Sequence, residues 1–243
     1  MGIVEMLGEN PKRVYSLSEI ASAFSLDKGT CSHILKTLAS RGFVRQDSPR
    51  GGYKFGYKLY HLTGHPVEND ELTKIARKDV EALGRDLNET ALLAVVNNDK
   101  RVVLYSTTPE RNLIVRTHTE RNVYSVCAGR VIIAHYTPSH LEKFIIRTGL
   151  PGQDEWPEIH RSSHPEQALA NALAHIKQDG YEILDDQHGL IGFAAPLFRD
   201  GHVVGSLGTY LPVYRMADKG KILETLLFYA GEINRKLGLS ESV

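Results

Sequence analysis

The stretch "SLSEIASAFSLDKGTCSHILKTLASRGFV", residues 16–44, contains two helix patterns separated by only three residues. In the first pattern Ser16 is followed three residues later by Glu19, which is the spacing of a capping box before an apolar helical face. In the second, Asp27 stands where it can cap a helix N-terminus, and Gly42 stands where a helix can end. Two short helices joined by so few residues predict a helix-turn-helix.

The second of these helices has two contrasting faces. Cys31, Ile34, Leu35 and Leu38 follow the i, i+3, i+4, i+7 pattern, so we expect them to be buried. The opposite face carries short or basic donor side chains and no acid, whereas exposed helix faces commonly pair Glu with Lys at i, i+4. This composition favours contact with a negatively charged surface over plain solvation.

The residues after Gly42 predict a β-hairpin. The strand-like runs "FVRQD" and "GYKFG" flank the turn-forming cluster "SPRGG", which places Arg50 at the tip. A helix-turn-helix followed by a basic hairpin is the winged form, in which the second helix enters the DNA major groove. We therefore expect DNA contacts from Lys28, Gly29, Thr30, Ser32, His33, Lys36, Arg50 and Lys54. Lys36, Arg50 and Lys54 would contact phosphates. The alternatives are a winged helix that binds protein and, for His33, a plain surface histidine.

Charge is unevenly distributed along the 243 residues, although the formal net charge is zero. Residues 1–65 contain nine Lys/Arg and five Asp/Glu, a net of +4, which leaves −4 for the remainder. A basic front and an acidic rear suggest two domains with different partners. The N-terminal residues lack the basic lead and apolar core of a secretion leader, so we expect none, and no apolar run approaches the roughly 18 residues of a membrane helix. Cys31 and Cys127 are far apart, so we expect no disulfide, a cytoplasmic protein and no membrane partner.

The rear of the chain predicts an α+β domain with a mostly antiparallel sheet. Residues 70–88 form an amphipathic helix whose apolar stripe, with the short first helix, is a candidate dimer surface. The expected strands are "ALLAVVN", "RVVLYST", "LIVRT", "YEILDD", "LIGFAAPLF" and "HVVGSLGTYL". The expected helices span 126–136, 139–148, 165–179 and 216–237. This gives a winged helix at 1–65, a linker helix at 66–88 and a second domain at 89–243.

At this point the chain resembles the isocitrate-lyase-regulator (IclR) family of bacterial transcription factors over nearly its whole length. The resemblance is carried by the 16–44 stretch and by "IARKDVEALGRDLNETALLAVV", "YSVCAGRVIIAHY" and "GYEILDDQHGLIGFAAPLFRDGHVVGSL", in this order. It implies an N-terminal winged helix, a C-terminal GAF-like effector-binding domain, and homodimers that often pair into tetramers. The implied partners are double-stranded operator DNA and, for a regulator of a metabolic operon, a small carboxylated metabolite. An arginine usual in the family's recognition helix is His33 here.

The resemblance also implies an effector pocket between the sheet and the helix that follows "YSVCAG". Carried over position by position, its lining is Cys127, Ala128, Gly129, Asp185, Gly192, Gly208 and Tyr210. Independently of the family, small residues that open a helix can leave backbone N–H groups free for an anion. We therefore expect the acid group at Ala128 and Gly129, with Asp185 accepting a hydrogen bond elsewhere on the ligand. Tight packing of helix on sheet is the competing interpretation of the small residues.

Two further functions use Cys127. At a helix N-terminus its thiol pKa could fall, which would suit a redox sensor or, more remotely, a Cys-dependent hydrolase with a neighbouring histidine base. The histidines of the second domain are numerous, but none comes with a CxxC motif, and we expect neither a metal site nor a cofactor. Ligand binding is the preferred hypothesis, because Cys127 fits equally well as a small pocket wall.

Overall fold

The computed structural model describes residues 2–10, 13–46, 48, 51–56, 58, 71–115, 118–185, 189–216 and 218–239. The chain divides into two compact units, Met1–Asn69 and Asp70–Val243, which we call the N-terminal unit and the sheet unit. None of the helices in these residues is both long enough and apolar enough to span a bilayer.

The N-terminal unit is a winged helix-turn-helix, as the sequence predicts. Its described elements are α1 (Gly2–Glu9), α2 (Leu17–Ala23), α3 (Lys28–Ser40), β1 (Val44–Gln46) and β2 (Tyr53–Phe55). The strands β1 and β2 pair antiparallel, with Arg45 opposite Lys54. Tyr15 extends this hairpin by exchanging two backbone hydrogen bonds with Tyr53, at 2.7 and 2.8 Å.

The predicted capping signals operate at three helix ends. Ser16 and Glu19 form a complete capping box, with the Glu19 N–H donating to Ser16 Oγ and the Ser16 N–H to Glu19 Oε2. Asp27 caps α3 by accepting from the Thr30 N–H at 2.9 Å. After α3, Gly42 has φ 75° and the Phe43 N–H reaches Leu38 O at 2.9 Å, which is a Schellman ending. Local sequence therefore sets the length and the ends of the two helices.

The core of the N-terminal unit corrects one expectation. Cys31 and Leu35 are fully buried and Leu38 is partly buried, as predicted, but Ile34 is 36% exposed. The buried positions centre on Cys31, Leu35 and Leu38, and Ile34 lies at the border of that stripe, on the side of Thr30 and Thr37. An apolar side chain is thus available beside the polar face of α3.

The sheet unit is built on one six-stranded antiparallel sheet with strand order β5-β4-β3-β8-β7-β6. Its strands are β3 (Thr90–Asn97), β4 (Lys100–Ser106), β5 (Glu120–Asn122), β6 (Glu182–Asp185), β7 (Leu190–Arg199) and β8 (His202–Pro212). The predicted hairpins β3–β4 and β7–β8 are both present. This sheet, with its grouped helices, confirms the predicted α+β architecture.

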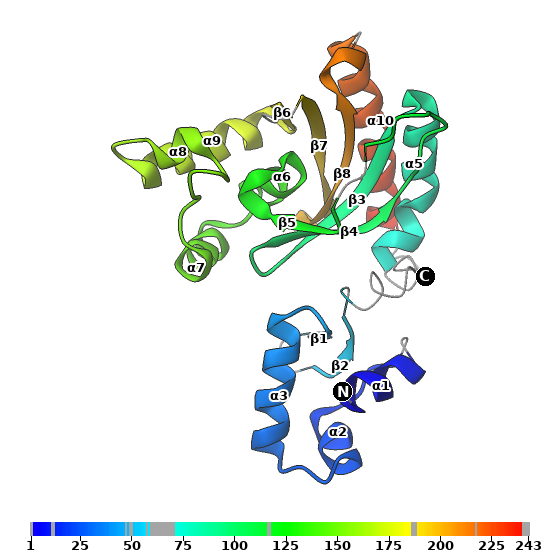
Figure 1. Cartoon of the computed structure of the whole chain (residues 1–243), viewed down its shortest axis with the longest axis vertical. Coiled ribbons are helices and arrows are strands. Elements are labelled where there is room, and N and C mark those ends of the chain that lie inside the picture. The colour runs from blue at the N-terminus through cyan, green and yellow to red at the C-terminus, as the bar shows by residue number, and fades with distance from the viewer. Residues whose placement is uncertain are drawn as a thin grey trace. The chain divides into compact units, whose positions relative to one another are not determined.

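Helices cover both faces of the sheet (Figure 1). On one face lies α6 (Cys127–Ala134), preceded by the short helix η1 (Val123–Ser125), with α7 (Pro138–Thr148), α8 (Pro157–His160) and α9 (Pro165–Asp179) beyond it. On the other face lie α5 (Glu71–Leu87) and α10 (Lys219–Leu239), and η2 (Val213–Arg215) follows β8. The helix α8 was not predicted, since four residues carry too little periodicity.

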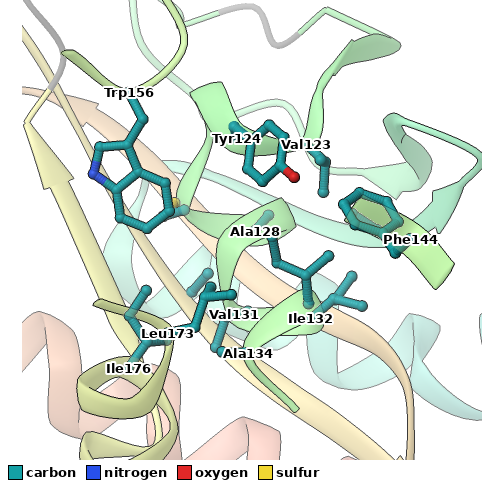
Figure 2. Packing of buried hydrophobic residues seen from close by; sticks show 14 of the residues in the cluster. Val123, Tyr124, Ala128, Val131, Ile132, Ala134, Phe144, Trp156, Leu173 and Ile176 are labelled. Carbon is teal, nitrogen blue, oxygen red and sulfur yellow. The ribbon is translucent and has the colours of Figure 1, made fainter. Parts of the chain in front are cut away.

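One hydrophobic core of the sheet unit lies between α6 and the sheet. Figure 2 shows Ala128, Val131 and Ile132 of α6 packed among aromatic and aliphatic side chains that include Tyr124, Phe144 and Trp156. Ala128 and Val131 are fully buried. The first turn of α6 is therefore part of the core.

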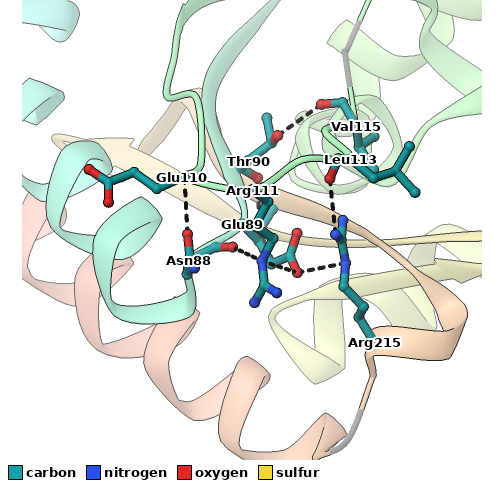
Figure 3. A network of polar contacts seen from close by, with 9 residues as sticks. Asn88, Glu89, Thr90, Glu110, Arg111, Leu113, Val115 and Arg215 are labelled. Atoms are coloured by element: carbon teal, nitrogen blue, oxygen red, sulfur yellow. Dashed lines mark hydrogen bonds and ion pairs between the residues drawn. The ribbon is translucent and has the colours of Figure 1, made fainter.

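The segment expected as a strand at "LIVRT" is a side-chain-bonded loop over residues 113–115, and the edge strand is β5 instead. Thr90 Oγ1 donates to Val115 O at 2.8 Å, and Arg215 Nη1 donates to Leu113 O at 3.0 Å (Figure 3). The carboxylate of Glu89 lies 3.0 Å from Arg215 Nε and 3.4 Å from Arg111 Nε. The carbonyl groups of Leu113 and Val115 therefore accept hydrogen bonds from side chains, where in a strand they would accept from a neighbouring strand.

The predicted dimer surfaces are also corrected. On α5, Leu72, Ala76, Val80 and Leu83 are buried, because α5 packs on β3, β4 and α10. On α1, Ile3 and Leu7 belong to the core of the N-terminal unit. Both apolar stripes are thus satisfied within one chain.

Candidate functional site

The polar face of α3 is a convex surface of exposed donors. Lys28, Gly29, Thr30, His33 and Lys36 are exposed, and Ser32 is half-buried. The Thr37 hydroxyl donates to His33 O and the Ser40 hydroxyl to Thr37 O, so these two hydroxyls bond back to the helix itself. The side chains that project from this face are therefore mainly those of His33 and Lys36.

The polar face of α3 has no acidic residue, but Asp27 places a carboxylate at the N-terminus of the helix. Hydrogen bonds from the Thr30 side chain and then its backbone N–H lower the pKa of Asp27. Both donors of Thr30 are thus directed to the cap, which leaves Thr30 less suited to bind phosphate than its exposure suggests. Lys54, on β2, is half-buried, and Arg50 lies outside the described residues.

In the sheet unit, three predicted pocket residues meet beneath the start of α6. The Sγ of Cys127 lies 3.1 Å from the phenolic oxygen of Tyr210. Gly192 pairs with Tyr210 in the sheet, and a Cβ on Gly192 would lie 2.5 Å from Tyr210 Cε1 and 2.7 Å from Cys127 Sγ. We call Cys127, Gly192 and Tyr210 the thiol–phenol group. The thiol and the phenol can approach each other because Gly192 has no side chain between them.

The thiol in this group is not activated. Burial raises the pKa of Cys127 to about 12, and burial likewise raises the pKa of Tyr210 well above its ordinary value. The predicted lowering of the thiol pKa by the helix N-terminus is therefore wrong, because desolvation outweighs it. The partner of the thiol is a phenol, while His135 Nδ1 lies 2.8 Å from Val131 O within α6.

At the start of α6, one of the two backbone donors expected for an anion is already engaged. The Gly129 N–H already donates to Val126 O at 3.0 Å, so it is not free. A Cβ on Gly129 would lie 2.3 Å from Val123 O, which shows that this glycine lets η1 pack closely on α6. Ala128 is fully buried, and its carbonyl accepts from Ser206 Oγ at 3.0 Å. Ala128 therefore packs on the sheet, as the competing interpretation expects, whereas Gly129 packs on η1.

Of the remaining predicted pocket residues, Gly208 is brought to this face and Asp185 is not. Gly208 lies in β8 opposite Leu92, and a Cβ there would lie 3.0 Å from Phe193 O. In β6, Leu184 packs on the α6 core, so its neighbour Asp185 points to the opposite face and is exposed. The prediction assigned the α6 face to Asp185, whereas the residue on that face is its neighbour Leu184.

Two buried arginines near the thiol–phenol group were missed from the sequence. Arg130 lies 3.4 Å from Glu182 Oε1 and 3.7 Å above the Trp156 ring, and its Nε donates to Tyr124 O. Arg101 of β4 is 1% exposed, and its Nη1 donates to His118 O at 2.9 Å. Arginine side chains are rarely fully buried, so only the folded arrangement of the strands and helices could have identified these two.

The histidines make no metal site within the described part of the chain, where no three His, Cys, Asp or Glu side chains gather suitably. His160 and His164 are four residues apart, but His160 ends α8 and His164 precedes α9. They therefore do not share the face of one helix, which zinc binding by that spacing requires.

A separate groove lies elsewhere on the sheet unit. It encloses about 680 Å³ between the end of α5 and the end of β4, and it is lined by Glu81, Gly84, Arg85, Asn88, Tyr105, Ser106, Thr107, Thr108, Pro109 and Glu110. Glu81 accepts from the Tyr105 hydroxyl at 2.7 Å across this groove. It is open and polar and contains no predicted pocket residue. The thiol–phenol group is kept as the candidate site, because it is where predicted pocket residues meet.

Comparison with known protein families assigns both units. Residues 1–48 match the model "IclR helix-turn-helix domain", and residues 64–235 match "Bacterial transcriptional regulator IclR C-terminal". The chain belongs to the IclR family of bacterial transcriptional regulators. The resemblance found in the sequence is thereby confirmed.

Individual IclR-family relatives are distant but cover most of the chain. The HTH-type transcriptional regulator KdgR of Escherichia coli (strain K12) is 25% identical over 90% of this chain and 82% of its own length. The glycerol operon regulatory protein of Streptomyces griseus is 26% identical over 93% of this chain and 90% of its own. Among solved structures, an IclR homolog complexed with 4-hydroxybenzoate from Microbacterium hydrocarbonoxydans aligns with TM-score 0.58 and 21% identity, over 96% of this chain and 97% of that one. This last likeness shows the shared fold.

Proposed function

We propose that this protein is a DNA-binding transcriptional regulator of a metabolic operon whose sheet unit senses a small organic acid. It would act in the cytoplasm on double-stranded operator DNA, as a homodimer or a dimer of dimers. The observation that carries the proposal is the exposed, acid-free face of α3 in a chain of this family.

The DNA-binding half rests on the character of that face. His33 and Lys36 project from the middle of α3, where a helix in the major groove meets base edges and phosphates. Ile34 adds an exposed apolar side chain at its border, of the kind that can contact a thymine methyl group. Lys28 and Lys54 would contact phosphates at the edges of the interface.

The sensing half rests on the relatives and on the buried polar groups of the sheet unit. The names of the relatives include a glycerol operon regulator, and one structural neighbour holds 4-hydroxybenzoate, an aromatic acid. In this chain the thiol–phenol group and the buried Arg101 provide polar contacts inside a largely apolar core. Such a mixture suits a small ligand that carries one charged group.

Redox sensing is not favoured, because a buried thiol with a raised pKa is a poor nucleophile. Treating the folded protein with iodoacetamide should therefore leave Cys127 unmodified and DNA binding unchanged. Loss of DNA binding on alkylation, reversed in Cys127→Ser, would favour the redox sensor instead.

The test of the proposal is fluorescence anisotropy with labelled duplex DNA over a range of salt concentrations. Lys36→Ala should weaken binding to specific and non-specific duplexes alike and reduce the slope of log K against log salt by about one. Lys78→Ala, which removes an exposed charge from α5, is the matched control and should leave both unchanged. An unchanged affinity and slope in Lys36→Ala would remove α3 as the DNA-binding surface.

A further inference from the structure

Arg101 is a buried cation without an anion. Its guanidinium makes one hydrogen bond among the described residues, from Nη1 to His118 O at 2.9 Å, and Nε has no partner. No carboxylate of the described residues forms an ion pair with it. The contrast with Arg130 is direct, because that equally buried arginine pairs with Glu182 and stacks on Trp156.

The sheet register places Arg101 on the α6 face. In β3 the alternate residues Ala94 and Val96 face the core under α6, and their β4 partners are Val103 and Arg101. The electrostatic interactions of Arg101 with Tyr210 and Cys127 partly offset the effect of burial, which lowers the Arg101 pKa. Arg101 therefore belongs to the same interior region as the thiol–phenol group.

An unpaired buried charge is costly, whereas an unpaired side chain at the surface is not. A guanidinium also matches the two oxygens of a carboxylate better than a lysine ammonium would. Other structural uses of arginine, such as covering apolar surface with the stem, leave the charged head in water, whereas Arg101 is only 1% exposed.

We infer that Arg101 is the anchor for the carboxylate of the effector, an inference that rests on the proposed sensing function. The effector would carry one carboxylate, because the neighbouring Arg130 is already neutralised by Glu182. The remainder of the ligand would meet the phenol of Tyr210 and the thiol of Cys127, which are uncharged. The acid group would thus be recognised by the buried Arg101 and not, as expected from the sequence, by the N-terminus of α6.

The experiment compares melting temperatures of the full chain and two variants. Arg101→Met removes the buried charge with a similar apolar stem. Arg121→Met removes an exposed charge from the residue that pairs with Arg101 in the sheet, and it is the matched control. Each protein is measured in chloride and after replacement of chloride, at constant ionic strength, by formate, acetate or benzoate. Benzamide is the uncharged counterpart of benzoate.

The wild-type protein and Arg121→Met should gain melting temperature with at least one carboxylate and not with benzamide. Arg101→Met should lose that gain, which corresponds to about tenfold or more weaker binding. In chloride alone Arg101→Met should melt at or above the wild-type temperature, because a buried unpaired charge has been removed. A purely structural arginine would instead lower the melting temperature when replaced.

Three results overturn the inference, and the first two concern the gain in melting temperature. One is the absence of any carboxylate-dependent gain in the wild-type protein, and the other is an equal gain in Arg101→Met. Equal stabilisation of the wild-type protein by benzoate and benzamide would also overturn the role of Arg101, while leaving ligand sensing itself in place. The DNA-binding half is tested separately by the α3 variants, so the two failures are distinguishable.

Discussion

The Sγ of Cys127 lies 3.1 Å from the phenolic oxygen of Tyr210, and Gly192 leaves the space in which the two side chains meet. Both groups are held in their neutral forms, since burial raises both pKa values. This relationship joins α6 to β8 and determines how the interior of the sheet unit responds to substitution and to pH.

The raised thiol pKa predicts a loss of stability at alkaline pH. Below about pH 9 the thiol is protonated in both the folded and unfolded chain, so its contribution is fully present. Between 9.0 and about 12 the unfolded thiol ionises while the folded one does not. The free energy of unfolding should then fall by up to about 1.4 kcal/mol per pH unit from this group. Urea titrations should show a shallower pH dependence in Cys127→Ala, and identical slopes in the two proteins would contradict the assignment.

Gly192→Ala should destabilise the sheet unit by overpacking. The added Cβ would meet Tyr210 Cε1 at 2.5 Å and Cys127 Sγ at 2.7 Å. The expected cost is about 1–3 kcal/mol. In Gly192→Ala/Cys127→Ala one of the two clashes is removed, so the double variant should lose less than the sum of the single variants. Strict additivity in chemical denaturation would show that the three side chains do not share this space.

Arg130→Met should be strongly destabilising, in contrast to Arg101→Met. It would leave Glu182 beside the core without its cation, and it would remove the stacking on Trp156. Breaking a buried pair on one side costs about 3–5 kcal/mol. The double variant Arg130→Met/Glu182→Gln should recover part of this loss. Denaturation midpoints near wild type for Arg130→Met would mean that the pair is not buried as described.

Asp27→Asn should strengthen DNA binding without unfolding α3. Asparagine keeps the capping oxygen that accepts from the Thr30 N–H, but it removes a negative charge at the end of α3 that carries Lys28. The anisotropy measurement should give a tighter complex whose advantage shrinks at high salt, while circular dichroism stays unchanged. If Asp27→Asn bound DNA at low salt no more tightly than the wild-type protein, the N-terminus of α3 would lie away from the DNA.

Sequence alone predicted the features that depend on local chemistry. The capping box at Ser16 and Glu19, the cap at Asp27 and the glycine ending at Gly42 each lie within a few residues of the groups they bond. The hairpins and the order of helices and strands follow from the same kind of signal. These features were sufficient to identify a winged helix and an antiparallel sheet.

The features that depend on tertiary register were not predictable in this way. Asp185 lies on the wrong face because β6 pairs with β7 so that Leu184, not Asp185, shares the face of Gly192. Gly129 is required by the close approach of Val123 O, which no pattern in "VCAG" reveals. Arg101 is the clearest case, since its burial depends on β3, on β5 and on α6 together.

The most direct test of DNA recognition by α3 is selection of genomic fragments by the purified protein, followed by footprinting of those enriched. We expect few fragments, each protected over two half-sites about one helical turn apart, as a two-fold dimer requires. Lys36→Glu, which places an acid in the middle of the face, should enrich none of them. Enrichment of the same fragments with the same footprint by Lys36→Glu would contradict recognition through this helix.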